Sequence, residues 1–172
     1  MINKGDLLIS TPESLGDYYF NRSIVMLTEV SDEEVVGFII NKELNYTLSD
    51  LDNKVLEKNI KIFSGGPVNQ DNLYFIHKYP HLIENSINFF NDLHWGGDFK
   101  KIIEMINKMK IDNSSIKFFS GYSGWTYNQL IGEINNGSWV IVKNKANCIF
   151  KKDIKKMWGE KMKKMDEKFK IW

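Results

Sequence analysis

Ser123 is the residue whose surroundings come closest to a catalytic motif. It lies in the stretch Gly121-Tyr122-Ser123-Gly124-Trp125, after a short apolar run at 116–119 and before a predicted helix that starts at Thr126. A serine at a sharp turn between a strand and a helix can act as the nucleophile of a hydrolase. However, Trp125 replaces the second flanking glycine of that motif, and all three histidines precede the serine. A hydrolase centred on the 121–125 turn is therefore the alternative hypothesis, and we predict no catalytic residue.

Two histidines have the spacing of a metal-binding pair, because His77 and His81 are four residues apart. Imidazoles at this spacing share one face of a helix, where they can bind a metal together. Tyr79 and Pro80 lie between them, and the proline excludes that helix. No cysteine or glutamate completes a recognisable ligand set. We therefore predict no metal site and no cofactor, with His77 as a hydrogen-bonded residue at a strand end and His81 and His94 in solvent.

Two further features could bind an anion. The turn Gly65-Gly66-Pro67 follows a predicted strand, and consecutive glycine amides can converge on a phosphate or a carboxylate. The alternative is that these glycines are needed only for a tight turn with positive φ. Arg22 is the only arginine of the chain, and its forked guanidinium suits either a bound anion or an internal carboxylate such as Asp17.

The composition is that of a folded protein with one domain. The chain has 172 residues, of which 42% are hydrophobic and 26% are charged, and we place a single domain over residues 1–172. The longest apolar run, Val35 to Ile40, is too short to span a bilayer, so no integral membrane contact is expected. Cys148 is the only cysteine, which agrees with a reducing compartment, and the predicted localisation is cytoplasmic.

The charge is unevenly distributed along the chain. The net charge is +1, but residues 151–172 contain nine lysines against four acidic residues. Apolar side chains recur there every three or four residues, at Ile154, Trp158, Met162, Met165, Phe169 and Trp172. This pattern predicts a basic amphipathic helix at about 151–172, which could bind a membrane surface, nucleic acid or a partner groove. The alternative is that Trp158 holds its first half to the core while the lysines face water.

Apolar runs predict the strands of the fold. They are expected at residues 6–9, 23–28, 35–40, 61–63, 73–77, 116–119 and 139–142. The second and third form a hairpin, in which Gly37 marks a bulge or a close approach of the backbone. Gly121 and Gly124 are expected to give the chain a sharp exit from the sheet.

Capping residues predict the helices. A short helix is expected near 47–51, and a second one after Asp98, with an apolar stripe formed by Ile102, Ile103, Ile106 and Met109. A third helix is expected from Thr126, whose hydroxyl would form a capping box with Gln129, and it would end at Asn135-Asn136-Gly137. The helix after Asp98 is interpreted as part of the core and not as a site of chemistry.

Five stretches, taken together in this order, resemble the YqgE/AlgH family of bacterial proteins. They are Gly5–Ile9, Phe20–Ile24, Gly37–Asn41, Gly65–Val68 with Phe75–His77, and Gly121–Trp125 with Gln129–Leu130. The resemblance implies an α/β (α+β) fold, in which a mostly antiparallel, bifurcated sheet forms a pseudo-barrel with helices packed outside. Members of this family are often labelled transcriptional regulators, although no reaction and no DNA-binding module is established for them.

The sequence departs from the family pattern at three places. Glu29-Val30 stands where the family usually has a histidine, Asn41-Lys42-Glu43 where it has Asn-Arg-Pro, and Gln129-Leu130-Ile131 where it has Gln-Leu-Glu. Chemistry that depended on those side chains would be missing here. The residues that do match the family are carried over, with Ser123, as candidate ligand-binding residues: Arg22, Asn41, Gly65, Gly66, Pro67, His77, Gly121, Trp125 and Gln129.

These observations favour a cytosolic, non-enzymatic protein that acts through an unknown protein partner or a small anion. We expect its recognition surface in one of two places. The first is a groove between the Gly65-Gly66-Pro67 turn and the 121–125 turn, both of which are expected to expose backbone amides. The second is the basic C-terminal helix. Direct binding of nucleic acid is expected only through that basic tail, because the sequence has no helix-turn-helix pattern.

Overall fold

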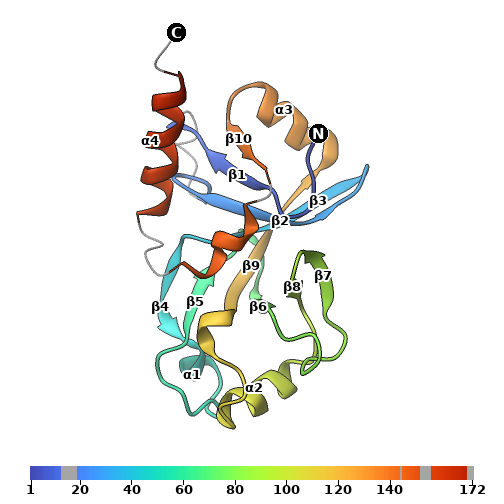
Figure 1. Ribbon diagram of the computed structural model, residues 1–172, viewed down its shortest axis with the longest axis vertical. Helices are drawn as coiled ribbons and strands as arrows, with labels where there is room; N and C mark the ends of the chain where they lie inside the picture. Colours follow the sequence, from blue (N-terminus) through green and yellow to red (C-terminus); the bar gives the residue numbers. More distant parts are fainter. Residues whose placement is uncertain (13–18, 144, 152–155, 170–172) are drawn as a thin grey trace.

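The computed structural model describes residues 1–12, 19–143, 145–151 and 156–169, and it shows an α+β fold around one ten-stranded sheet (Figure 1). The strands are β1 (Leu7–Ser10), β2 (Ile24–Val30), β3 (Glu34–Ile39), β4 (Glu43–Thr47), β5 (Lys61–Ser64), β6 (Val68–His77), β7 (Ile87–Phe90), β8 (Leu93–Trp95), β9 (Ile116–Thr126) and β10 (Trp139–Val142). The helices are α1 (Leu48–Leu51), α2 (Phe99–Asn107), α3 (Tyr127–Asn135) and α4 (Met157–Phe169), with short 3-10 helices η2 (Asn113–Ser115) and η3 (Ala146–Phe150).

The sheet divides at β9. The first half of this strand pairs with β5 in parallel and with β6 in antiparallel orientation, while its second half pairs with β3. The main path runs β10-β1-β2-β3-β9-β6-β8-β7, and β4 joins through β5. Among the described strands, the β5–β9 pair is the only parallel one. The expected mostly antiparallel, bifurcated sheet is confirmed, and it stays open instead of closing into a barrel.

The predicted hairpin of β2 and β3 is confirmed, and both strands are largely buried. Gly37 is the point of close approach: a Cβ atom there would lie 2.7 Å from the carbonyl oxygen of Met26. The pairing register shifts opposite it, between Leu27 and Glu29 of β2. A bulge and a tight backbone contact therefore occur together at the glycine.

The predicted sharp exit from the sheet at Gly121 and Gly124 is wrong, because β9 continues as a strand through Thr126. Gly121 instead has a φ of +72° and lies where the strand passes from its β5 and β6 partners to β3. Pairing with β3, as in the Val35–Trp125 pair, satisfies the backbone groups of this segment. The glycine is thus a kink within the strand that divides the sheet.

The helices begin where their caps predict. Thr126 accepts a 3.1 Å hydrogen bond from the backbone N–H of Gln129 at the start of α3, and Asp98 accepts one of 3.0 Å from Lys100 at the start of α2. The predicted stripe of α2 is buried at Ile102, Ile103 and Ile106. Met109 is not part of it: the helix ends at Asn107, and Met109 has a φ of +58° and is 90% exposed.

Helix α4 lies beside β1, in the same half of the molecule as α3, whereas α1 and α2 lie at the other end (Figure 1). Helix α4 covers Met157–Phe169, and η3 ends at Phe150, so the predicted helix start at 151 is too early. Two residues of the predicted apolar stripe, Ile154 and Trp172, lie outside the described residues. Trp158, Met162 and Met165 pack against the core. No helix within the described part of the chain is long and apolar enough to cross a membrane.

Candidate functional site

The two glycine-bearing segments predicted to flank a groove are in direct contact. The amide of Gly65 donates a 2.8 Å hydrogen bond to the carbonyl of Ser120, so it is not exposed as predicted. A Cβ atom on Gly66 would overlap the Oγ of Ser123, and one on Gly121 would lie 2.6 Å from the carbonyl oxygen of Gly66. This contact leaves no gap between the turn and β9 at these residues.

Ser123 is fully buried, and its hydroxyl donates a 3.0 Å hydrogen bond to the carbonyl of Gly65. It lies within a strand and not at a strand-to-helix turn. The interpretation as a nucleophile elbow is therefore wrong, because that motif requires an exposed hydroxyl at a strained turn. The serine instead ties the Gly65 turn to β9.

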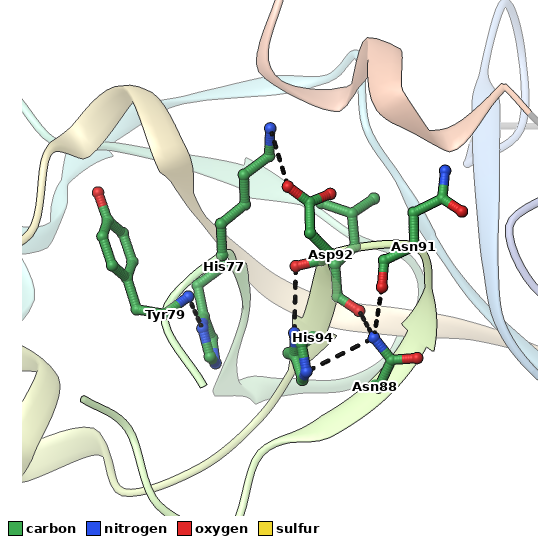
Figure 2. A network of polar contacts seen from close by, with 8 residues as sticks. His77, Tyr79, Asn88, Asn91, Asp92 and His94 are labelled. Atoms are coloured by element: carbon green, nitrogen blue, oxygen red, sulfur yellow. Dashed lines mark hydrogen bonds and ion pairs between the residues drawn. The ribbon is translucent and has the colours of Figure 1, made fainter. Parts of the chain in front are cut away.

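His77 is a buried residue at the end of β6, as predicted (Figure 2). Its Nδ1 accepts a 3.0 Å hydrogen bond from the backbone N–H of Tyr79, so the proton lies on Nε2, which donates to the carbonyl of Gly96 at 3.1 Å. Burial is the main cause that lowers the pKa of His77, so the imidazole is neutral near pH 7. These contacts give the ring a structural role.

The neighbouring histidines differ from one another in exposure. His81 is exposed as expected, but His94 is half-buried, because its ring stacks on that of His77 at a centroid distance of 6.0 Å. The Nδ1 of His94 donates to the carbonyl of Asp92, and its Nε2 faces the amide of Asn88 (Figure 2). Within the described residues, no group of three potential ligand side chains could hold a metal ion.

Trp125 and Gln129 lie at the start of α3. The Trp125 indole is 5% exposed, stacks on Phe20 at a centroid distance of 5.6 Å and meets Trp139 edge-on at 5.9 Å. The backbone N–H of Gln129 takes part in the cap at Thr126, and its side chain is exposed. Packing and capping therefore account for what these two residues do here.

Arg22 and Asn41 are the two candidates that the fold brings together beside a cavity. This cavity, here called the Arg22 groove, has a volume of about 910 Å³ and lies between the turn before β2, the chain after β3 and helix α4. Its size falls in the upper part of the range for small-molecule sites. It is lined by Asn21, Arg22, Asn41, Lys42, Glu43, Lys156, Trp158, Gly159, Glu160 and Lys163.

Asn41 fixes the backbone of Arg22 in an unusual conformation. Arg22 has a φ of +52°, a left-handed value that few residues other than glycine adopt. The Nδ2 of Asn41 donates a 2.9 Å hydrogen bond to the carbonyl of Arg22, while its Oδ1 accepts one of 2.9 Å from the backbone N–H of Ile24. One side chain thus holds both sides of the turn, and the Arg22 side chain is exposed.

Trp158 forms the opposite wall of the groove. Its indole N–H donates a 2.8 Å hydrogen bond to the carbonyl of Ser10, which anchors α4 to β1. The guanidinium of Arg22 lies 5.8 Å from the centre of its ring, within the range of a cation–π contact. The earlier alternative for Arg22, an ion pair with Asp17, involves a residue outside the described part of the chain.

The lining of the groove is more basic than acidic. Arg22 and three lysines face it with two glutamates, and one of these, Glu43, forms a 2.6 Å ion pair with Lys61. The Oδ1 of Asn21 is a buried acceptor with no donor among the described residues. The cations of the lining suit an anion.

A family model described as AlgH-like matches residues 7–170 of the chain. The chain belongs to the AlgH-like family. A UPF0301 protein of Cytophaga hutchinsonii is 35% identical over 172 residues, covering 99% of this chain and 94% of the relative, and one of Bacteroides fragilis is 37% identical over 174 residues, covering 100% and 87%.

Two solved structures are similar to this AlgH-like protein in fold. Protein DIP2367 from Corynebacterium diphtheriae has a TM-score of 0.75 at 20% identity, covering 95% of this chain and 87% of that one. The solution structure of the AlgH protein from Pseudomonas aeruginosa has a TM-score of 0.69 at 21% identity, covering 86% and 80%.

The candidate residues of this AlgH-like protein do not form one site. Arg22 and Asn41 share the groove, the glycines and Ser123 share the contact between the turn and β9, and His77, Trp125 and Gln129 lie elsewhere. Sequence reasoning also missed Lys117, which is 6% exposed within β9. The available signal was a lysine inside the apolar run 116–119.

Proposed function

We propose that this AlgH-like protein is a non-enzymatic, cytosolic binding protein, and that it binds a small anion in the Arg22 groove. The observation that carries the proposal is the position of Arg22 at the edge of the groove, with its backbone and its side chain both held by neighbouring residues. Its left-handed backbone is held by Asn41, and its guanidinium lies over Trp158 at the edge of the groove. Backbone strain that persists because neighbouring groups hold it is typical of ligand sites.

The chemistry of the groove favours an oxyanion. The N–H groups of a guanidinium lie in its own plane, where two of them can bind two oxygens of a phosphate or carboxylate. Lys42, Lys156 and Lys163 add positive charge to the same lining.

The hydrolase alternative has less support. It requires a base within hydrogen-bond reach of an accessible Ser123, whereas the hydroxyl of this buried serine already donates to Gly65. A role in transcription by direct contact with DNA would have to use the lysines of α4. The geometry of the groove does not add support for DNA binding.

A protein partner is the second candidate, and the surface of α4 supports it. Lys156, Lys163 and Lys164 are exposed on or next to this helix. An acidic partner could contact them while Trp158 keeps the helix on the core. Capture of one defined acidic protein from cytosolic extract, lost in a Lys163→Glu/Lys164→Glu variant with unchanged melting, would favour this candidate over the small anion.

The proposal is tested by titrating inorganic phosphate into the protein and into two variants of Arg22. Arg22→Lys keeps the charge but loses the fork, and Arg22→Gln loses both. We expect Arg22→Gln to weaken phosphate binding at least about tenfold, with Arg22→Lys in between, because charge-assisted hydrogen bonds contribute about 1.5–3 kcal/mol.

Lys100→Gln is the matched control, since Lys100 is an exposed cation on α2, away from the groove lining. It should bind phosphate like the unaltered protein. Binding at 100 times the dissociation constant should stabilise the folded protein by about 2.7 kcal/mol, which a thermal melt detects. Equal binding by Arg22→Gln and the unaltered protein, or no binding of phosphate, sulfate or acetate at all, would refute the proposal.

A further inference from the structure

Lys117 is a buried lysine in the central strand of the sheet. Its Nζ donates hydrogen bonds of 2.7 Å to the carbonyl of Ile40 and 3.1 Å to the carbonyl of Ile149, and it lies 4.0 Å from the centre of the Phe63 ring. The amine therefore contacts β5, the chain after β3 and η3 at once. None of these contacts belongs to the Arg22 groove.

A small cavity of about 190 Å³ is lined in part by Lys117. Its lining includes Lys117 together with Phe63 and Ile149, the same residues that surround the Nζ atom. Lys61 and Lys151 also line it, and no described lining residue is acidic. The volume is below the usual range for drug-sized ligands, so the cavity suits a molecule of a few heavy atoms with a negative charge.

Burial makes the uncharged form of the amine accessible near pH 7. Burial lowers the pKa of Lys117 to about 7, while Cys148 and Glu43 act in the opposite direction. Burial also raises the pKa of the Cys148 thiol, which is therefore neutral near pH 7. A neutral amine has two N–H groups for the two carbonyls and a lone pair, which makes it a nucleophile.

We propose that Lys117 forms a reversible Schiff base with a small carbonyl compound that carries a carboxylate, such as a 2-oxo acid or its aldehyde analogue. The nitrogen lone pair adds to the carbonyl carbon, and one amine proton passes to the carbonyl oxygen. The carbinolamine then loses its hydroxyl group and the second amine proton as water, which leaves a C=N bond. Lys151 in the lining supplies a positive charge for the carboxylate, whereas Lys61 is ion-paired with Glu43 at 2.6 Å. No oxidant or reductant is needed.

The inference is independent of the proposed function, because it concerns another cavity. It is tested with glyoxylate as the probe and sodium cyanoborohydride as the trap, on the full-length native protein at pH 7, with modified lysines identified by peptide mass mapping. An ordinary lysine has only about 1 part in 2,000 of free amine at pH 7, against about half for a pKa of 7. We expect Lys117 to be modified at least about tenfold faster than Lys61 or Lys151, even with its limited access.

Two controls make the result decisive. Lys117→Arg keeps N–H donors for the two carbonyls but has no nucleophilic amine, so it should lose the fast labelling. If this variant does not fold, the pattern of modified lysines in the unaltered protein still decides. Without the trap, glyoxylate should raise the melting temperature more than acetate does. Labelling of Lys117 slower than or equal to that of Lys61 and Lys151, or only after unfolding, would overturn the proposal. Equal stabilisation by acetate would overturn the covalent step.

Discussion

Replacing Arg22 with glycine and with alanine separates backbone strain from side-chain contacts. Both changes remove the cation–π contact with Trp158, which at an exposed site contributes about 0.5–1 kcal/mol. Only glycine also relieves the left-handed backbone at φ +52°, which costs a residue with a Cβ about 1–2 kcal/mol. Glycine also loses more conformational entropy on folding than alanine, which lowers the stability of the glycine variant by about 0.5–1 kcal/mol.

These magnitudes predict that the glycine variant is the more stable of the two. Arg22→Ala should lower the free energy of unfolding by about 0.5–1 kcal/mol, whereas Arg22→Gly should be close to the unaltered protein or slightly more stable. A difference of about 1 kcal/mol corresponds to roughly 2–4 °C in melting temperature for a chain of this size. Urea denaturation of all three proteins in one buffer without phosphate measures it. An alanine variant as stable as or more stable than the glycine variant would refute the argument that Arg22 is strained.

Further predictions concern parts of the fold outside the Arg22 groove. Trp125→Ala should lower the free energy of unfolding by about 3–5 kcal/mol, because the indole is 5% exposed, and a loss below about 1 kcal/mol in urea denaturation would contradict this packing. Gly66→Ala should cost about 1–3 kcal/mol, since its Cβ would overlap Ser123, whereas the control Gly132→Ala in α3 has open space and should be neutral or stabilising; equal melting of both would contradict the contact. His77 has a lowered pKa when folded, so the unfolded chain binds more protons and stability should fall as the pH drops below about 6.5. The fall should be smaller in His77→Gln, as measured by urea denaturation between pH 5 and 8, and equal slopes would contradict the neutral imidazole.

Much of the fold could be predicted because its signals are local. The apolar runs of β2 and β3 and the caps at Asp98 and Thr126 involve residues a few positions apart, and they predict the same elements that the structure contains. Three strands were missed, namely β4, β7 and β8. They are short and largely exposed or half-exposed, so no apolar run marks them.

The error at residues 121–124 has a physical reason. Glycine permits positive φ equally well in a turn and in a kink within a strand, so Gly121 alone does not decide between them. The outcome depends on pairing between Val35 and Trp125, which are far apart in the sequence. A prediction from local signals could not include that pairing.

The candidate site depends even more on contacts distant in sequence. Asn41 holds the Arg22 turn from 19 positions away, and Trp158 reaches the same groove from the last helix. The family resemblance identified Arg22 and Asn41 as candidates, but it did not indicate that they lie close to α4. Lys117 was visible only as a charged residue in an apolar strand, and its carbonyl partners follow from the fold.

The central claim is that an anion binds in the Arg22 groove, and NMR spectroscopy of the isotope-labelled protein during a phosphate titration tests it most directly. The account predicts saturable shifts of the Arg22 side-chain N–H, the Asn21 side-chain amide and the Trp158 indole N–H, with little change at the Gly65–Gly66 turn. Shifts confined to residues 65–66 and 121–125, or no saturable shift at Arg22 and Trp158, would contradict it.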